Sequence, residues 1–246
     1  RTEAPDVTAP HPPRPAQVEP PDAVARVQEL GTRLVLQRPR LAVVDKPAGW
    51  LSVPGRRADD DPRPCAGRLL EKLLGTRVFP VHRLDAEVSG LLLFALDPGA
   101  QRTASAWFEG RLVYKDYFAW SERDEETSMP APEPRRWECL LARGKRRAYE
   151  HPVAGKPSLT LAWLLEARPT PAGAVLSWRL QPHTGRSHQL RYELARHGCP
   201  ILGDTLYGAH LPWPPGGIAL RAVALDLTAV PLAERLGLPA RLELSG

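Results

Sequence analysis

A run of six apolar residues at 91–96 (LLLFAL) constrains the fold of this chain more than any other feature. The run is too short to cross a membrane and follows a Ser-Gly pair at 89–90 that is typical of a turn. It therefore indicates a strand buried on both faces, although periodicity alone also allows a buried helix. His82, Arg83 and Asp85 stand just before it. A buried strand would hold this charged loop rigidly, as a catalytic carboxylate requires. An ordinary Arg-Asp surface loop entering a strand explains the same residues equally well.

Arginine supplies most of the positive charge of this basic chain. The 246 residues carry 33 Lys and Arg against 28 Asp and Glu, a formal net charge of +5, and lysine stands at only five positions. A basic surface favours a polyanionic partner, and the planar guanidinium group binds phosphate and stacks on bases. The composition therefore favours RNA or DNA as the partner. A genome rich in arginine codons explains the same bias, so both explanations stay open.

The cysteines and the hydropathy pattern argue against several classes of protein. Cys65, Cys139 and Cys199 lack the spacing of a zinc finger or a disulfide framework, so we expect a reducing compartment, the cytoplasm. No stretch is long and apolar enough to cross a bilayer, and no signal peptide is recognisable. There is no P-loop, dinucleotide fingerprint or cluster of metal ligands. We therefore expect no cofactor, no metal and no membrane contact. We also expect a protein that acts as a monomer.

Composition divides the chain into a tail at 1–31 and a folded body at 32–246. Seven prolines fall within the first 21 residues, which is typical of a flexible or polyproline-like segment. Acidic residues outnumber arginines in the tail, so the basic character belongs to the body. Within the body, residues 121–150 are polar, charged and proline-containing, and we expect a long loop or insertion there.

Strand patterns outnumber helix patterns in the body. Short apolar runs and alternating patterns predict strands at 34–36, 41–44, 91–96, 113–120, 159–165 and 176–180. The apolar spacing over 100–108 predicts a helix that ends at Gly110. A second helix is predicted over 187–197, with Leu190 and Leu194 facing inward. Because strands and helices are interspersed without strict βαβ alternation, we expect an α+β fold with a mixed, mostly antiparallel β-sheet and flanking helices.

Five motifs of the body occur in the order seen in one enzyme family. They are DKPAGW (45–50), HRLDAEVSGLLLFA (82–95), KDYFA (115–119), HTGRSHQLR (183–191) and GCPILGDTLYG (198–208). In this order and at this spacing they resemble the RNA pseudouridine synthases of the RluA type, over almost the whole body. The resemblance implies a pseudouridine synthase fold with a central active-site cleft across the sheet. It also implies an enzyme that isomerises specific uridines in structured RNA, either rRNA or tRNA, to pseudouridine without a cofactor or metal.

The same resemblance implies roles for three residues. Asp85 matches the essential aspartate of the family. Tyr117 matches the tyrosine that stacks on the target base and is a candidate general base. Arg186 matches the arginine that pairs with the aspartate. These three residues are therefore the predicted catalytic group.

The chemistry of the reaction agrees with these residue types. Breaking the bond from N1 to C1′ and joining C5 to C1′ requires an ionised carboxylate, which attacks the nucleoside or removes a sugar proton. A nearby arginine favours the charged carboxylate, so Arg186 would keep Asp85 active at neutral pH. Tyr117 could take the C5 proton or position a water. Because the base must leave the helical stack, we expect an aromatic pocket floor, with Arg83 contacting a phosphate or filling the vacated space.

Further RNA contacts are expected from His82, Lys46, Lys115, His188 and Arg191. Several of these residues have a simpler interpretation. His82 fits a hydrogen-bonding residue within its loop, His188 a brace of the following helix, and Lys46 a solvated turn. The basic cluster at 143–147 is either an RNA contact or a solvated loop.

Two departures and two alternatives accompany the resemblance. Val88 stands where the family usually has Thr, and Arg221 stands where it often has His. One alternative is a non-catalytic RNA-binding or ribosome-assembly factor on the same fold. The other is a hydrolase that uses Asp85 with a histidine. A glycosidase would need a second carboxylate opposite the first, and no such partner is evident in the sequence.

Overall fold

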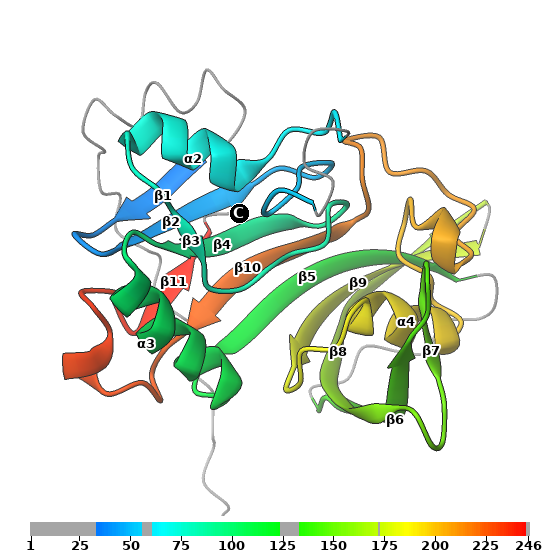
Figure 1. Ribbon diagram of the computed structural model, residues 1–246. Coiled ribbons are helices and arrows are strands. Elements are labelled where there is room, and N and C mark those ends of the chain that lie inside the picture. Colours follow the sequence, from blue (N-terminus) through cyan, green and yellow to red (C-terminus); the bar gives the residue numbers. More distant parts are fainter. Residues whose placement is uncertain (1–32, 56–60, 124–132, 172, 245–246) are drawn as a thin grey trace, which may run out of the picture.

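The computed structural model describes residues 33–55, 61–123, 133–171 and 173–244 (Figure 1). The predicted tail at 1–31 lies outside these residues. The described residues form one eleven-stranded mixed sheet with helices packed against it. This is the α+β class that the sequence predicts.

The sheet contains strands from nearly the whole described chain. In chain order they are β1 (Arg33–Gln37), β2 (Leu41–Lys46), β3 (Phe79–Pro80), β4 (Ser89–Ala95), β5 (Tyr114–Arg123), β6 (Arg135–Arg143), β7 (Ala148–Glu150), β8 (Lys156–Thr170), β9 (Gly173–Pro182), β10 (Leu220–Asp226) and β11 (Arg241–Glu243). The helices are α2 (Ala66–Leu74), α3 (Pro98–Glu109) and α4 (Gln189–Arg196), with 3-10 turns η1 (Thr205–Tyr207) and η2 (Leu232–Glu234). Neighbouring strands follow the order β1-β2-β4-β10-β5-β9-β8-β6-β7, with β3 added to β4 and β11 to β10. The described strands pair antiparallel except for β4 with β10, so the sheet is mostly antiparallel as predicted.

The apolar run at 91–96 forms most of β4, which is buried on both faces. Leu91 and Leu93 share a core cluster with the inner face of α3. Leu92 and Phe94 share another cluster with the inner face of α2. The two helices lie on opposite sides of this end of the sheet (Figure 1). Because both faces are covered, the strand sequence is continuously apolar instead of alternating.

The predicted turn at 89–90 is wrong, because both residues belong to β4. Gly90 has a φ of 115°, a conformation that residues with a side chain rarely adopt. A Cβ added to Gly90 would lie 2.2 Å from the carbonyl oxygen of Ala222 on β10. The glycine is therefore needed where the parallel pair β4–β10 brings two backbones together.

The predicted loop or insertion at 121–150 is also largely wrong. Strand β5 extends to Arg123, and β6 and β7 occupy most of the remainder, while 124–132 lies outside the described residues. Trp137 is buried on β6, whereas the adjacent Arg136 and Glu138 are exposed. The charged residues are thus the solvated face of a strand. Helix α2, which the sequence analysis does not predict, also belongs to the fold.

The second predicted helix is confirmed over Gln189–Arg196, slightly shorter than the expected 187–197. Leu190 and Leu194 are buried in a cluster with Trp178 and Leu180 of β9. Helix α4 is thereby fixed against β9 (Figure 1). The segment that connects β9 to α4 is held at the same end of the sheet.

Candidate active site

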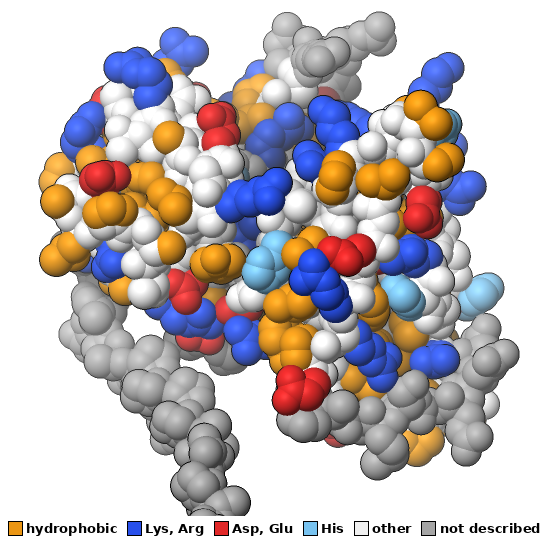
Figure 2. Space-filling view, turned by 90° about the horizontal axis from the view of Figure 1, so that it is seen from below, with side chains coloured by type: hydrophobic (Ala, Val, Ile, Leu, Met, Phe, Trp, Pro, Cys, Tyr) orange, Lys and Arg blue, Asp and Glu red, His pale blue; other side chains and the backbone are white. Residues whose placement is uncertain are grey.

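A cleft of about 1320 Å³ crosses the sheet between its two ends. One wall is the loop of residues 81–88 between β3 and β4, and strand β5 contributes the floor. The opposite wall is built by residues 141–143, the start of β8 and the segment 182–191. The molecular surface is hollowed near the middle of the face seen in Figure 2, and Lys and Arg side chains border the hollow. The cleft brings together eight of the nine predicted site residues: His82, Arg83, Asp85, Lys115, Tyr117, Arg186, His188 and Arg191.

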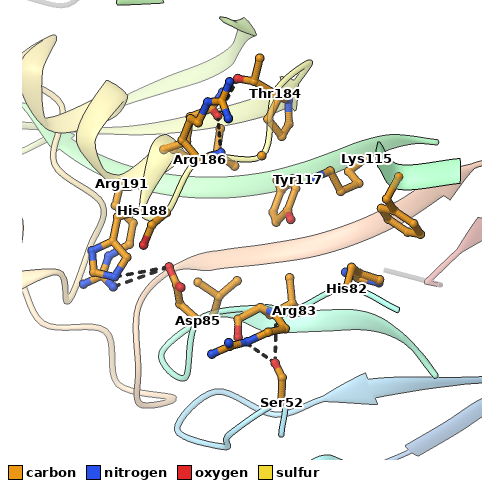
Figure 3. Close-up of a pocket in the computed structure, with 18 of the residues that line it drawn as sticks. Ser52, His82, Arg83, Asp85, Lys115, Tyr117, Thr184, Arg186, His188 and Arg191 are labelled. Atoms are coloured by element: carbon orange, nitrogen blue, oxygen red, sulfur yellow. Dashed lines mark hydrogen bonds and ion pairs between the residues drawn. The ribbon is translucent and has the colours of Figure 1, made fainter. Parts of the chain in front are cut away.

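Asp85 lies in the loop between β3 and β4 and reaches into the cleft (Figure 3). Its side chain is 35% exposed, so that a substrate can reach it. One oxygen, Oδ2, is 3.8 Å from Nε2 of His188 and 4.0 Å from Nη1 of Arg191. The carboxylate therefore faces the α4 side of the cleft from the end of a loop that the buried strand β4 anchors.

Two side chains, Lys46 at the end of β2 and Ser52 in the segment after it, hold this loop in place. Ser52 Oγ donates to the carbonyl oxygen of Leu84 at 2.7 Å and accepts from the Leu84 N–H at 3.0 Å. Lys46 Nζ donates to the carbonyl oxygens of Pro47, Trp50 and Ala86 at 2.8–3.1 Å. Leu84 and Ala86 flank Asp85, so these bonds fix the backbone on both sides of the carboxylate.

Lys46 is consequently not the RNA contact that the sequence suggests. Its side chain is completely buried, and all three of the carbonyls it binds belong to the protein. Burial lowers the pKa of Lys46 to about 8, against the opposing effect of the Glu87 and Asp85 charges. Its role is to pin the Asp85 loop, and a lysine in a turn sequence gives no sign of that burial.

Arg191 is also buried instead of being available to phosphate. Its side chain is 3% exposed, and its guanidinium donates from Nε and Nη2 to the two carboxylate oxygens of Asp204 at 2.7 and 2.8 Å. Nη1 lies 3.3 Å from Oε2 of Glu87. The helical spacing indicated this burial, because Arg191 is adjacent to Leu190 and three residues before Leu194, and both leucines face inward.

Arg186 does not pair with Asp85 in this structure. Its Nε donates instead to the carbonyl oxygen of Pro157 at 3.0 Å, and the side chain lies beside Thr184 (Figure 3). The arginine that approaches Asp85 is Arg191, so this structure does not contain the predicted Arg186–Asp85 pair. Both arginines belong to one motif, and sequence spacing does not indicate which of them turns toward the carboxylate.

The turn that carries Arg186 is nevertheless well ordered by Gln189. The Gln189 side-chain oxygen accepts from Thr184 Oγ1 at 2.8 Å and from the Arg186 N–H at 3.1 Å. Its amide nitrogen donates to Leu159 and Thr160 of β8. Gln189 thus ties the 183–191 motif to the sheet and leaves the side chain of Arg186 at the cleft wall.

Tyr117 lies on β5 and is 8% exposed at the floor of the cleft. Burial raises the pKa of Tyr117 well above its usual range, and the negative charge of Asp85 adds to the rise. A phenolate is therefore disfavoured in the folded protein. The neutral ring is available as an aromatic surface and a hydrogen-bond donor.

His82, predicted as an RNA contact, lines the cleft but makes its contacts within the protein. Its Nε2 accepts from the backbone N–H of Leu93 at 3.1 Å, and its ring stacks on Phe108 of α3 with 4.7 Å between centroids. Burial, with a smaller contribution from the Lys115 charge, lowers the pKa of His82 to about 3. The ring is neutral at physiological pH and connects the loop to β4 and α3.

Arg83 and Lys115 remain candidates for contact with RNA. Arg83 is exposed at the cleft edge, and Lys115 lies on the floor two residues before Tyr117 (Figure 3). Burial lowers the pKa of Lys115. Neither side chain has a carboxylate partner within the described residues, so both cations are free to meet an anionic ligand.

Sequence reasoning did not place Glu87, Asp204 and Tyr207 around His188 and Arg191. Asp204 and Tyr207 stand in a motif of turn residues, but the structure turns both toward the Asp85 side of α4. A buried arginine needs acidic partners, so the inward position of Arg191 on its helix was the signal that could have pointed to them. In the described part of the chain no three potential metal ligands converge, and no helix could span a membrane.

Comparisons with known proteins agree with this geometry. The family described as RNA pseudouridylate synthase matches residues 40–196, which include Asp85, Tyr117 and Arg186. The chain is 34% identical over 180 residues to the dual-specificity RNA pseudouridine synthase RluA of Vibrio vulnificus (strain CMCP6), a match that covers 72% of this chain and 69% of that protein. It is also 34% identical over 186 residues to the tRNA pseudouridine synthase C of Salmonella typhimurium (strain LT2), covering 71% and 69%. Among solved structures, human RNA Pseudouridylate Synthase Domain Containing 1 superposes with a TM-score of 0.64 at 25% identity, covering 85% of this chain and 81% of that one.

Proposed function

The chain belongs to the RNA pseudouridylate synthase family, and we propose that it isomerises uridine in RNA with Asp85 as the catalytic carboxylate. The observation that supports this assignment is the placement of one partly exposed carboxylate, on a clamped loop, in a basic cleft with an aromatic floor. The reaction breaks the bond from N1 to C1′, forms the bond from C5 to C1′, and moves a proton from C5 to N1. No atom is gained or lost.

Asp85 starts the reaction by attacking the nucleoside or by removing a sugar proton. Either step needs the ionised carboxylate within reach of the sugar, and a rigid loop lowers the entropy cost of that approach. The clamps from Ser52 and Lys46 on the neighbouring residues provide this rigidity. The reaction is therefore centred on the loop of residues 81–88.

Tyr117 acts as a neutral floor for the flipped uracil. Burial disfavours its phenolate, so we assign it stacking and hydrogen bonding to the base, or to the water that receives the C5 proton. Arg186 is released from the Pro157 carbonyl when RNA enters, and turns to the Asp85 carboxylate or to the phosphate of the target nucleotide. Its present anchor is a single hydrogen bond near the surface, which RNA can readily replace.

The RNA lies along the basic border of the cleft. Arg83 and Lys115 are placed to contact the phosphates next to the flipped nucleotide. The names of the relatives, a dual-specificity RNA pseudouridine synthase and a tRNA pseudouridine synthase, support a uridine in structured RNA, either rRNA or tRNA, as the substrate. We further propose that the protein acts as a monomer in the cytoplasm, where its three free cysteines would stay reduced.

The test is to map pseudouridines in total RNA treated with the protein or with its Asp85→Asn variant. We expect new pseudouridines at discrete positions with the wild type and none with the variant. RNA binding without pseudouridine on any RNA would support the non-catalytic alternative, and release of free uracil would support a hydrolase. Gel filtration over a range of concentrations tests the monomer.

A further inference from the structure

His188 lies between Asp85 and Tyr207 at the start of α4. Its backbone φ is 53°, in the left-handed region, and its side chain makes no capping bond to the helix. A residue with a Cβ adopts this conformation at a cost, so that the position of the ring needs another explanation. That explanation is found in the two partners of the ring.

The hydrogen bonds of Tyr207 determine which ring nitrogen of His188 carries the proton. The backbone N–H of Ala148 on β7 donates to Tyr207 Oη at 2.7 Å. Tyr207 Oη lies 3.1 Å from Nδ1 of His188, and the described residues offer its proton no other acceptor. With the hydroxyl as the donor to Nδ1, the neutral imidazole carries its proton on Nε2.

Burial of the ring favours this neutral form. Asp85 and Glu87 face His188 from the loop before β4, Asp204 and Tyr207 from the η1 segment, and Arg191 from α4 itself. Burial and Arg191 lower the pKa of His188, and they outweigh the three carboxylates, which act in the opposite direction. The Nε2–H group thus faces Asp85 as a neutral donor.

The tyrosine is itself fixed in place. The Arg191 guanidinium lies 5.3 Å from the centre of the Tyr207 ring, and Asp204 holds that guanidinium by two hydrogen bonds. The rings of His188 and Tyr207 meet edge to face with 5.8 Å between centroids. The histidine is therefore supported by a packed group whose members contact one another.

We propose that His188 is a positioning residue for Asp85: Tyr207 fixes the tautomer of its ring, and the Nε2–H directs Oδ2 of the carboxylate, which leaves Oδ1 to the nucleoside. Among the described residues, His188 and Arg191 approach Oδ2, and none donates a hydrogen bond to Oδ1. The 3.8 Å separation from Nε2 shortens to a hydrogen bond when substrate fills the cleft, as catalytic contacts often do. This proposal rests on the proposed function of Asp85.

Two substitutions separate a positioning role from a purely structural one. His188→Asn suits the left-handed backbone and keeps a polar group near Nδ1 for Tyr207, but it is too short to reach Asp85. His188→Gln places an N–H donor at the distance of Nε2, on a side chain that suits this backbone less well. A structural role favours the asparagine variant, and a positioning role favours the glutamine variant.

The measurement is the single-turnover rate and the KM on the RNA identified by mapping. Loss of one hydrogen bond to a charged group is expected to lower kcat about tenfold or more for His188→Asn, with KM unchanged. His188→Gln is expected to stay within about threefold of the wild type, because its donor replaces Nε2–H. An asparagine variant as active as, or more active than, the glutamine variant would overturn the proposal.

A second measurement does not require activity, so it separates failure of this proposal from failure of the proposed function. The ¹⁵N NMR spectrum of the His188 ring in the free protein should show Nε2 protonated and Nδ1 bare. Tyr207→Phe should allow both tautomers, and Asp85→Asn should shift the Nε2–H signal. A proton on Nδ1 in the wild type, or no response to Asp85→Asn, would contradict the arrangement even if pseudouridine is formed.

Discussion

The two walls of the cleft differ in how firmly their polar side chains are held. The loop of residues 81–88 is clamped by Lys46, Ser52 and His82 through hydrogen bonds to backbone groups. On the opposite wall, Arg186 makes one hydrogen bond near the surface, and Arg143 is the cleft-lining end of an exposed basic turn at 143–147. The difference indicates that one wall fixes the reacting carboxylate and the other adapts to RNA. A rigid loop at the first wall is useful because the reaction tolerates little displacement of the Asp85 carboxylate.

Lys46→Met tests the firm wall and has the largest expected effect of the four changes below. It leaves buried carbonyl groups without a donor, so the free energy of unfolding should fall by about 2–4 kcal/mol. Because the Ala86 carbonyl next to Asp85 is released, kcat should fall as well. Urea unfolding and single-turnover rates provide the measurements. Lys72→Met, at an exposed position on α2, is the control and should change stability by less than about 0.5 kcal/mol. Equal losses in the two variants would show that the clamp is unimportant.

The pH dependence of stability tests the contribution of His82 to the same wall. The pKa of His82 is about 3 in the folded protein, below the 6.5 that is usual for histidine. The unfolded chain therefore binds a proton that the native ring does not, and stability should fall as the pH falls from about 6.5 toward 3. The free energy of unfolding of the wild type should decrease over this window relative to that of His82→Gln, which does not titrate. Parallel curves for the two proteins would contradict a ring that stays neutral in the folded protein.

Arg186→Ala tests the adaptable wall. Its bond to Pro157 lies near the surface, so unfolding should change little, whereas kcat should fall about ten- to hundredfold because a charged contact to Asp85 or phosphate is lost in the complex. Arg168→Ala, outside the cleft and paired with Glu166, is the matched control and should leave the rate unchanged. A variant as active as this control would remove Arg186 from the mechanism.

Neutralising the basic turn should have the smallest effect per residue. Arg143, Lys145, Arg146 and Arg147 are exposed and make no ion pair within the described part of the chain. Each Lys or Arg that meets a phosphate contributes about 0.7–0.9 to the slope of log affinity against log salt. Changing Lys145 and Arg146 to Gln should raise KM modestly, lower this slope and leave kcat unchanged. The corresponding change of Arg68, which is exposed on α2 at the other end of the sheet from β6 and β7 (Figure 1), should leave the slope unaltered.

The sequence predicted the parts of the fold whose signals are local. The apolar run of β4 and the two amphipathic helices carry their periodicity within a few residues, so a single sequence suffices for them. Strand β6 was missed because exposed charges such as Arg136 and Glu138 alternate with buried residues and conceal its apolar face. Helix α2 was not predicted, although Leu70 packs on β4.

For the site, the sequence by itself determined which chemical groups are present: one carboxylate at Asp85, an aromatic residue at Tyr117 and a set of cations in ordered motifs. Only the tertiary structure decided which cations are buried and which face the cleft. Arg191 meets Glu87 from 104 residues away, and Lys46 reaches Ala86 across 40 residues. The residue type alone does not show whether a lysine or arginine is buried or exposed at the cleft. Its role depends on the partners that packing brings to it across the sheet, because burial without such partners is too costly to persist.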